Sequence, residues 1–166
     1  MNMETKIELV QLSWTKDANI VVGQSHFIKT VEDIAEIMAS SVPGASYGLA
    51  FNEASGPCLV RTAGNDDTLI ADATRCALAS AAGHSFFLVI GTGAFPINVL
   101  DRIKNCQEVC RIFCATANPV QLLVARSEQG AGILGVIDGF SPLGVEDEAA
   151  KADRIGMLRR FGYKFA

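Results

Sequence analysis

The first residue whose surroundings could do chemistry is His26, one of only two histidines in the chain. It lies in the segment Gln24–Thr30, which we expect to join the end of a strand to the start of a helix. The backbone N–H groups of Val31–Asp33 and the Lys29 ammonium would make this junction an anion site. There, His26 would contact a bound phosphate or accept a phosphoryl group. The alternative is a half-buried histidine satisfied by a backbone carbonyl, and the residue types alone favour neither interpretation.

The second histidine, His84, directly follows an expected helix end and opens an apolar strand, which favours a structural role. Beyond that strand lies the turn Gly91–Gly93. The third glycine of a dinucleotide-binding fingerprint is replaced there by Pro96, and the chain contains no P-loop motif. The turn is therefore either a place where a ligand approaches the backbone or simply a tight loop.

Polar residues interrupt apolar stretches where expected strands give way to loops. Taken singly, each is a turn former or a helix cap, but as a set they favour a polar-lined cleft suited to a ribose or a base. The set comprises Asn52-Glu53, Arg61-Thr62, Asn65-Asp66-Asp67, Asn98, Thr116, Asn118 and Asp138.

The composition limits the class of protein. The 166 residues are 49% hydrophobic and 19% charged, whereas an average soluble domain is about 25% charged. This apolar surplus predicts that another subunit covers part of the surface. A net charge of −4 argues against nucleic-acid binding. No apolar run reaches the ~20 residues of a membrane span, and the N-terminal residues lack the apolar run of a signal peptide, so we expect a cytoplasmic protein with no membrane partner.

The five cysteines are expected to be buried free thiols, because they occur inside apolar runs. Cys106, Cys110 and Cys114 recur every four residues, but no second cysteine pair or nearby histidine completes a zinc site. We therefore expect core packing and no metal ligands.

The pattern of apolar residues predicts one α/β domain over residues 1–166, with one mixed sheet of about eight strands and about four helices packed on it. The first two strands, in residues 5–14 and 20–23, are expected to form a hairpin. Thr30 is the expected N-cap of the first helix, with Asp33 in the capping-box position. Asn65–Asp67 caps the second helix, which Gly83 ends, and a last helix runs from Glu146 to Gly162.

Several long blocks carry a family likeness: Gly23–Asp33, Phe51–Pro57, Val60–Thr62, Gly64–Asp66, Ala94–Leu100, Val109–Pro119 and Gly135–Pro142. Through them the chain resembles the adenosine-specific kinase family, over about residues 6–164. The resemblance implies a homotrimer of mixed α/β subunits that binds adenosine or its nucleotides in a cleft between subunits, beside a phosphorylatable histidine. By motif this histidine is His26, with His84 as the reserve candidate.

The function implied by the resemblance is an adenosine-specific phosphotransferase, with His26 as the phosphoryl acceptor and Lys29 stabilising the phosphoryl charge. We expect no tightly bound cofactor, with ATP, ADP, AMP or another phosphoryl donor as a substrate and Mg²⁺ as a candidate companion ion. The alternatives are a non-catalytic adenine-nucleotide sensor and a structural trimer component with an empty cleft. The expected substrate contacts are Gln24, Glu53, Asn65, Asp66, Phe95, Pro96, Asn98, Thr116, Asn118 and Asp138.

Overall fold

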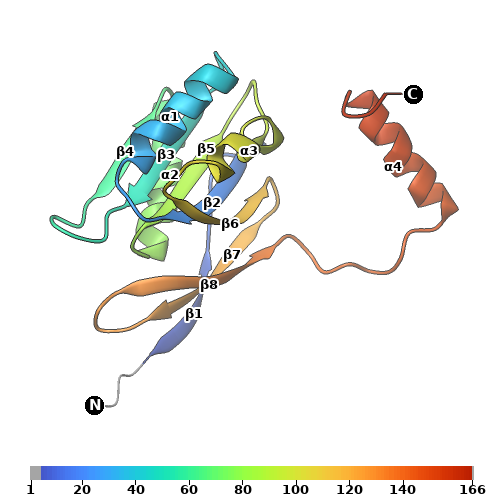
Figure 1. Cartoon of the computed structure of the whole chain (residues 1–166). Helices are drawn as coiled ribbons and strands as arrows, with labels where there is room; N and C mark the ends of the chain where they lie inside the picture. Colours follow the sequence, from blue (N-terminus) through green and yellow to red (C-terminus); the bar gives the residue numbers. More distant parts are fainter. Residues whose placement is uncertain (1–4, 166) are drawn as a thin grey trace.

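The computed structural model describes residues 5–165 and contains two antiparallel sheets (Figure 1). The five-stranded sheet has the order β4-β3-β5-β2-β6, with β2 (Asn19–Ser25), β3 (Tyr47–Asn52), β4 (Val60–Gly64), β5 (Ser85–Ile90) and β6 (Val109–Thr116). The three-stranded sheet has the order β1-β7-β8, with β1 (Lys6–Gln11), β7 (Val120–Arg126) and β8 (Ala131–Asp138). The helices are α1 (Thr30–Ser41), α2 (Asp67–Ser80), α3 (Leu100–Lys104) and α4 (Glu148–Arg160), with a 3₁₀ turn at Pro96–Asn98.

The α/β class and the numbers of strands and helices are confirmed, whereas the strands form two antiparallel sheets in place of the expected single mixed sheet. The expected hairpin of the first two strands is also wrong. β1 pairs with β7, where Leu9 lies opposite Leu123, and β2 lies between β5 and β6. An alternating pattern shows that a strand has one buried face, but it does not identify the strand's partner.

The five-stranded sheet separates two apolar cores. Alternate residues of β2 point to opposite faces, as strand geometry requires. Ile20 and Val22 belong to the core that also contains residues of α2 and of the three-stranded sheet. Val21 belongs to the core formed with α1 and the α3 region. β5 is buried along its whole length, as expected for a central strand.

α2 packs closely on β3. The helix buries a stripe of small residues that includes Ala73, Cys76 and Ala77. On the strand, a Cβ atom at Gly48 would lie 2.1 Å from the carbonyl carbon of Leu69. Glycine is therefore required at this position, because any side chain would collide with the helix backbone.

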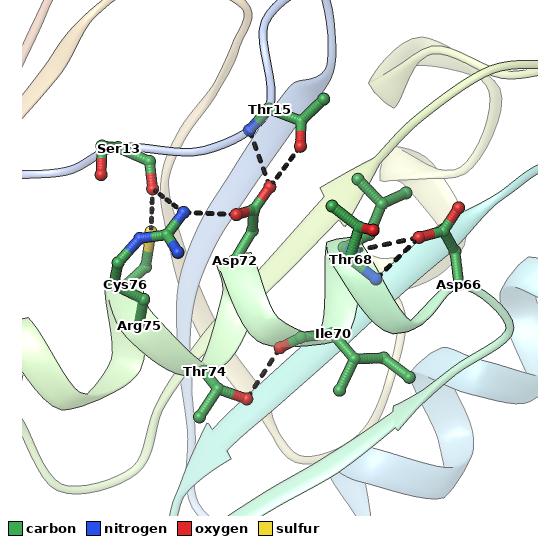
Figure 2. A network of polar contacts seen from close by, with 10 residues as sticks. Ser13, Thr15, Asp66, Thr68, Ile70, Asp72, Thr74, Arg75 and Cys76 are labelled. Atoms are coloured by element: carbon green, nitrogen blue, oxygen red, sulfur yellow. Dashed lines mark hydrogen bonds and ion pairs between the residues drawn. The ribbon is translucent and has the colours of Figure 1, made fainter.

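The start of α2 is as predicted, and its end is not. Asp66 is the N-cap residue and accepts hydrogen bonds from the backbone N–H groups of Thr68 at 3.0 Å and Leu69 at 3.1 Å (Figure 2). The helix ends at Ala81, which adopts a left-handed conformation with φ of 49°, so the terminating residue is not Gly83.

α4 stands apart from both sheets (Figure 1). Its predicted ends are close to those observed, because Asp147 caps it by accepting from the Ala150 N–H at 2.8 Å and Gly162 adopts a φ of 76° after it. The expectation that it packs on the sheet is wrong, since none of its residues is buried. The remaining three helices cover the five-stranded sheet.

The five cysteines are all free, but not all are buried. Cys76 and Cys114 are in the core, where burial raises the pKa of the first thiol to about 11 and of the second to about 12. Cys58 and Cys110 are exposed and Cys106 is half-buried, so the prediction of five buried thiols is wrong for these three. No helix within residues 5–165 is both long and apolar enough to span a membrane.

Candidate functional site

The predicted site residues lie at two opposite ends of the five-stranded sheet. Along β2, Asn19 lies opposite Ile90 and Gln24 lies opposite Ser85, so the two ends of this strand mark the two ends of the sheet. We call them the histidine end (Ser25, Ser85 and Asn52 with the segments that follow) and the glycine-loop end (Asn19, Ile90 and Thr116 with theirs). At about 3.3 Å per residue, the six or seven residues of a strand separate the two ends by roughly 17–20 Å.

Four of the expected catalytic residues and substrate contacts lie at the histidine end: Gln24, His26, Lys29 and Glu53. His26 directly follows β2 and is exposed. Its backbone N–H donates to the Glu108 carbonyl at 2.9 Å, which fixes the residue beside the start of β6. Its ring is stacked with that of Phe27, at 6.1 Å between centroids and 18° between planes. The imidazole is therefore held by its neighbour while remaining open to a ligand.

The expected cap at Thr30 is wrong, because Thr30 is buried inside the first turn of α1. Its hydroxyl lies 2.7 Å from the Phe27 carbonyl oxygen and 2.7 Å from the Ser25 hydroxyl. The N-cap position is held by Lys29, whose side chain makes no capping bond and instead pairs with Asp33.

The expected backbone anion site is wrong as well. The Val31 N–H donates to the Ile28 carbonyl at 3.2 Å, and the Asp33 N–H donates to the Lys29 carbonyl at 3.0 Å. These donors are therefore used within the turn. They are not available to an anion at this junction.

A cavity of about 620 Å³ at this end brings two cationic side chains together. Lys29, from the start of α1, and Arg61, from β4, both line it. The hydrogen bond from Lys29 to Asp33 raises the pKa of the ammonium, so Lys29 is charged at neutral pH. The full lining is Phe27, Ile28, Lys29, Val31, Glu32, Val60, Arg61 and Thr62.

Glu53 holds Arg61 in place. Both carboxylate oxygens accept from Arg61 Nη2, at 3.1 and 3.2 Å, and one of them also accepts the Leu59 N–H at 3.0 Å. The hydrogen bond from Leu59, together with Arg61, lowers the pKa of Glu53, so this carboxylate is a poor proton acceptor. Among the described residues, the buried Nε atom of Arg61 has no hydrogen-bond partner. Glu53 thus positions the Arg61 guanidinium at the cavity.

The reserve candidate, His84, also lies at the histidine end but is less accessible. It is partly buried, its ring is stacked on Phe51 at 5.9 Å between centroids, and its backbone is left-handed with φ of 62°. Its carbonyl accepts the Ser25 N–H at 2.9 Å. The backbone of His84 therefore adjoins the residue before His26, and its packing agrees with the structural role expected for it.

The glycine-loop end contains a second cavity, of about 570 Å³. Asp66 and Phe95 of the predicted set line it, with the Gly91–Gly93 turn and the loop before β2. Gly93 adopts a φ of 96°, a conformation that favours glycine. Phe95 is 58% exposed, so its ring is free to stack on a planar ligand. This turn is part of a cavity wall.

Most other members of the predicted set at this end are bound to neighbouring groups. Asn65 accepts the Tyr47 N–H and donates to the Ala45 carbonyl, both at 2.9 Å, and Asn98 accepts the Phe95 N–H at 2.8 Å. Pro96 is buried in the 3₁₀ turn.

Three further members hold the turn between β6 and β7 to the end of β8. The Thr116 hydroxyl accepts the Asn118 N–H at 3.0 Å, and the Asn118 amide donates to Asp138 at 3.2 Å. Each of these three side chains therefore has a hydrogen-bond partner within the protein.

Two residues that organise these ends are not among the expected catalytic residues or substrate contacts. Arg61 belongs only to the set of polar residues at strand ends. Asp72 was missed, although a carboxylate on the apolar face of a helix is a recognisable signal. It accepts the N–H and hydroxyl of Thr15, which lines the glycine-loop cavity (Figure 2). No cluster of three or more His, Cys, Asp or Glu side chains within residues 5–165 could hold a metal ion.

The fold is shared with a known protein. A solved structure, the PH1918 protein from Pyrococcus horikoshii OT3, is 37% identical and superposes with a TM-score of 0.92 over 98% of this chain and 100% of its own. No match was found among curated proteins. Residues 10–164 match the profile of the family described as adenosine specific kinase. This match covers nearly the whole sequence, and the chain therefore belongs to the adenosine specific kinase family.

Proposed function

We propose that this protein is an adenosine-binding phosphotransferase that carries the phosphoryl group on His26. Membership of the adenosine specific kinase family supports the substrate and the reaction class. The observation that carries the assignment to His26 is its exposure and the stacking of its ring with Phe27, which lines the same cavity as Lys29 and Arg61. Two cations facing one cavity provide the charge that a phosphoryl group requires.

In the first step, a neutral ring nitrogen of His26 attacks the terminal phosphorus of the donor. The N–P bond forms while the P–O bond to the departing group breaks and leaves its electron pair on that oxygen. Lys29 and Arg61 stabilise the charge on the phosphoryl oxygens. In the second step, a hydroxyl oxygen of adenosine attacks the phosphorus and the N–P bond breaks. The electron pair of the N–P bond returns to the ring nitrogen, which restores the neutral histidine, and the hydroxyl proton is released to solvent.

The adenosine contacts in this proposal come from a neighbouring subunit. Within one chain, Asp66, Phe95 and Thr116 lie at the glycine-loop end, roughly 17–20 Å from the end that carries His26. A homotrimer with its cleft between subunits would bring the histidine end of one copy to the glycine-loop end of the next. The low charged fraction of 19% supports such an assembly, because subunit contacts cover apolar surface.

The second candidate function is an adenine-nucleotide sensor without turnover. One observation favours it: both cations of the cavity already have carboxylate partners, Asp33 for Lys29 and Glu53 for Arg61. Because the carboxylates offset part of the positive charge, such a site would bind a phosphate group without transferring it.

The product of the reaction separates these functions. The purified protein is incubated with adenosine and ATP, and nucleotides are resolved by chromatography. We expect AMP from the wild type, loss of AMP in His26→Asn and retention in His84→Asn. A sensor gives a thermal shift with adenosine but no AMP, and a structural component gives no shift. Formation of AMP by His26→Asn at the wild-type rate contradicts the proposal.

A further inference from the structure

The last described residues form an apolar arm that projects from its own subunit and is joined to it by the hydrogen bond from the Gly139 N–H to the Pro119 carbonyl at 2.9 Å. We define the C-terminal arm as residues 139–165, which include α4. Its linker exposes Phe140 by 90%, Leu143 by 105% and Val145 by 98%, and Phe161 and Phe165 are 65% and 88% exposed beyond the helix. Figure 1 shows the arm running away from both sheets.

The arm is nevertheless ordered internally. Arg154 forms a bidentate ion pair with Glu146: Nη2 donates to Oε1 at 2.7 Å and Nε donates to Oε2 at 2.9 Å. This pair connects the helix to the linker. Among the described residues, the hydrogen bonds and ion pairs of residues 140–165 all have both partners inside the arm. Within residues 140–165, the polar contacts that shape the arm are therefore its own.

The three-stranded sheet has a face that is equally unpartnered. One face packs into the core through Leu122 and Val124, which are fully buried. The opposite face, which we call the outer face, exposes Ile7 by 63%, Leu9 by 60%, Leu134 by 59% and Ile137 by 45%. An antiparallel sheet covered on one side normally presents polar residues to water on the other. An apolar outer face is the pattern of a surface that another chain covers.

The superposition on the solved structure from Pyrococcus horikoshii extends over the arm, because it covers 98% of this chain. The arm makes up about one sixth of the 166 residues, and a superposition that omitted it could not reach the observed TM-score of 0.92 over 98% of the chain. We infer that a projecting segment which keeps its position at 37% identity, and whose hydrogen bond to the rest of the subunit is at Gly139, is held from outside the subunit.

We propose that the C-terminal arm of one copy lies on the outer face of the three-stranded sheet of a second copy. Each copy supplies one arm and one face, so a closed ring of identical copies covers every arm and every face with none left over. An arm of 27 residues also matches the ~20–30 residues that each side contributes to a standard-sized interface. This contact rests on the geometry of the arm and the sheet and is independent of phosphoryl transfer.

The first test measures the mass of the full chain by light scattering at micromolar concentration. We expect the wild type at a multiple of 17.6 kDa. The arm variant Phe140→Ser/Leu143→Ser/Val145→Ser and the face variant Leu9→Ser/Leu134→Ser should each fall to a single-chain mass. The matched control, Leu78→Ser, changes a residue of α2 that is 62% exposed and lies outside both surfaces, and it should keep the wild-type mass.

Folding of the variants is checked by circular dichroism, and the arm variant should keep the wild-type spectrum because its three side chains are exposed. The second test places a photo-crosslinking residue at position 143 in a mixture of isotope-labelled and unlabelled chains. Mass spectrometry should find mixed-isotope cross-links from position 143 to peptides of β1 or β8. A monomeric wild type, an oligomer that survives in both variants, or cross-links confined to the same copy or to other elements would overturn the proposal.

Discussion

Replacing Asp72 with alanine is expected to destabilise the protein by about 3 kcal/mol. The carboxylate is buried with 4% exposure, and it accepts the N–H and the hydroxyl of Thr15, both at 2.7 Å (Figure 2). A hydrogen bond to a charged group contributes about 1.5–3 kcal/mol. Each of the two bonds is expected to contribute the lower value, about 1.5 kcal/mol. The reason is that Thr15 is exposed, so water replaces the acceptor that it loses. The ion pair to Arg75, whose side chain is 53% exposed, adds little.

Thermal unfolding measures this effect. For a chain of this size, about 1 kcal/mol corresponds to about 2–4 °C, so Asp72→Ala should lower the melting temperature by about 6–12 °C at neutral pH. The control, Arg75→Ala, removes the exposed partner alone and should cost less than about 1 kcal/mol.

The pH dependence tests the same interaction. Burial alone would raise the pKa of Asp72, but the hydrogen bonds from Thr15 and the pairing with Arg75 outweigh it, so the pKa is lowered on folding. The charged carboxylate therefore stabilises the protein above its unfolded pKa, and this stability is lost as the pH falls through the lower folded pKa. The gap between wild type and Asp72→Ala should narrow in that acidic range. Melting temperatures within 1 °C of each other at neutral pH, or a gap that widens on acidification, would refute the reasoning.

Two further predictions concern the core. Gly48→Ala should cost at least about 2 kcal/mol in chemical denaturation, because its Cβ would lie 2.1 Å from the α2 backbone, whereas Gly130→Ala meets open space and should stay within about 0.5 kcal/mol; equal effects would contradict the packing described. At about pH 8, iodoacetamide should modify exposed Cys58 but not buried Cys76 or Cys114, whose pKa values are about 11 and about 12. Peptide mass spectrometry reads this pattern, and native modification of the buried pair at the Cys58 rate would disprove it.

Local features of the fold could be predicted because they depend on neighbouring residues. Asp66 caps α2 through groups two and three positions away, and Gly162 follows α4 in the expected conformation. Strand pairing could not be predicted, because it depends on distant residues: Lys6 of β1 lies opposite Arg126 of β7. The cap expected at Thr30 was wrong because its hydroxyl is engaged by Ser25 and Phe27.

The candidate site was harder to predict for a geometric reason. Polar residues at strand ends converge when neighbouring strands are parallel. In this protein the strands are antiparallel, so successive strand ends alternate between opposite ends of the sheet. This separates Glu53, after β3, from Thr116, at the end of β6. The role of Arg61 was equally out of reach, because its partner Glu53 and the cavity it shares with Lys29 arise from tertiary packing.

Phosphate labelling tests the central claim most directly, because it reads the covalent intermediate itself. The purified protein is incubated with ATP that carries a radioactive terminal phosphate, and the protein-bound label is followed through acid and alkali treatment. The proposal predicts an acid-labile label that is lost in His26→Ala and kept in His84→Ala. A label that remains in His26→Ala, or one that is lost only in His84→Ala, would contradict the assignment of His26 as the phosphoryl acceptor.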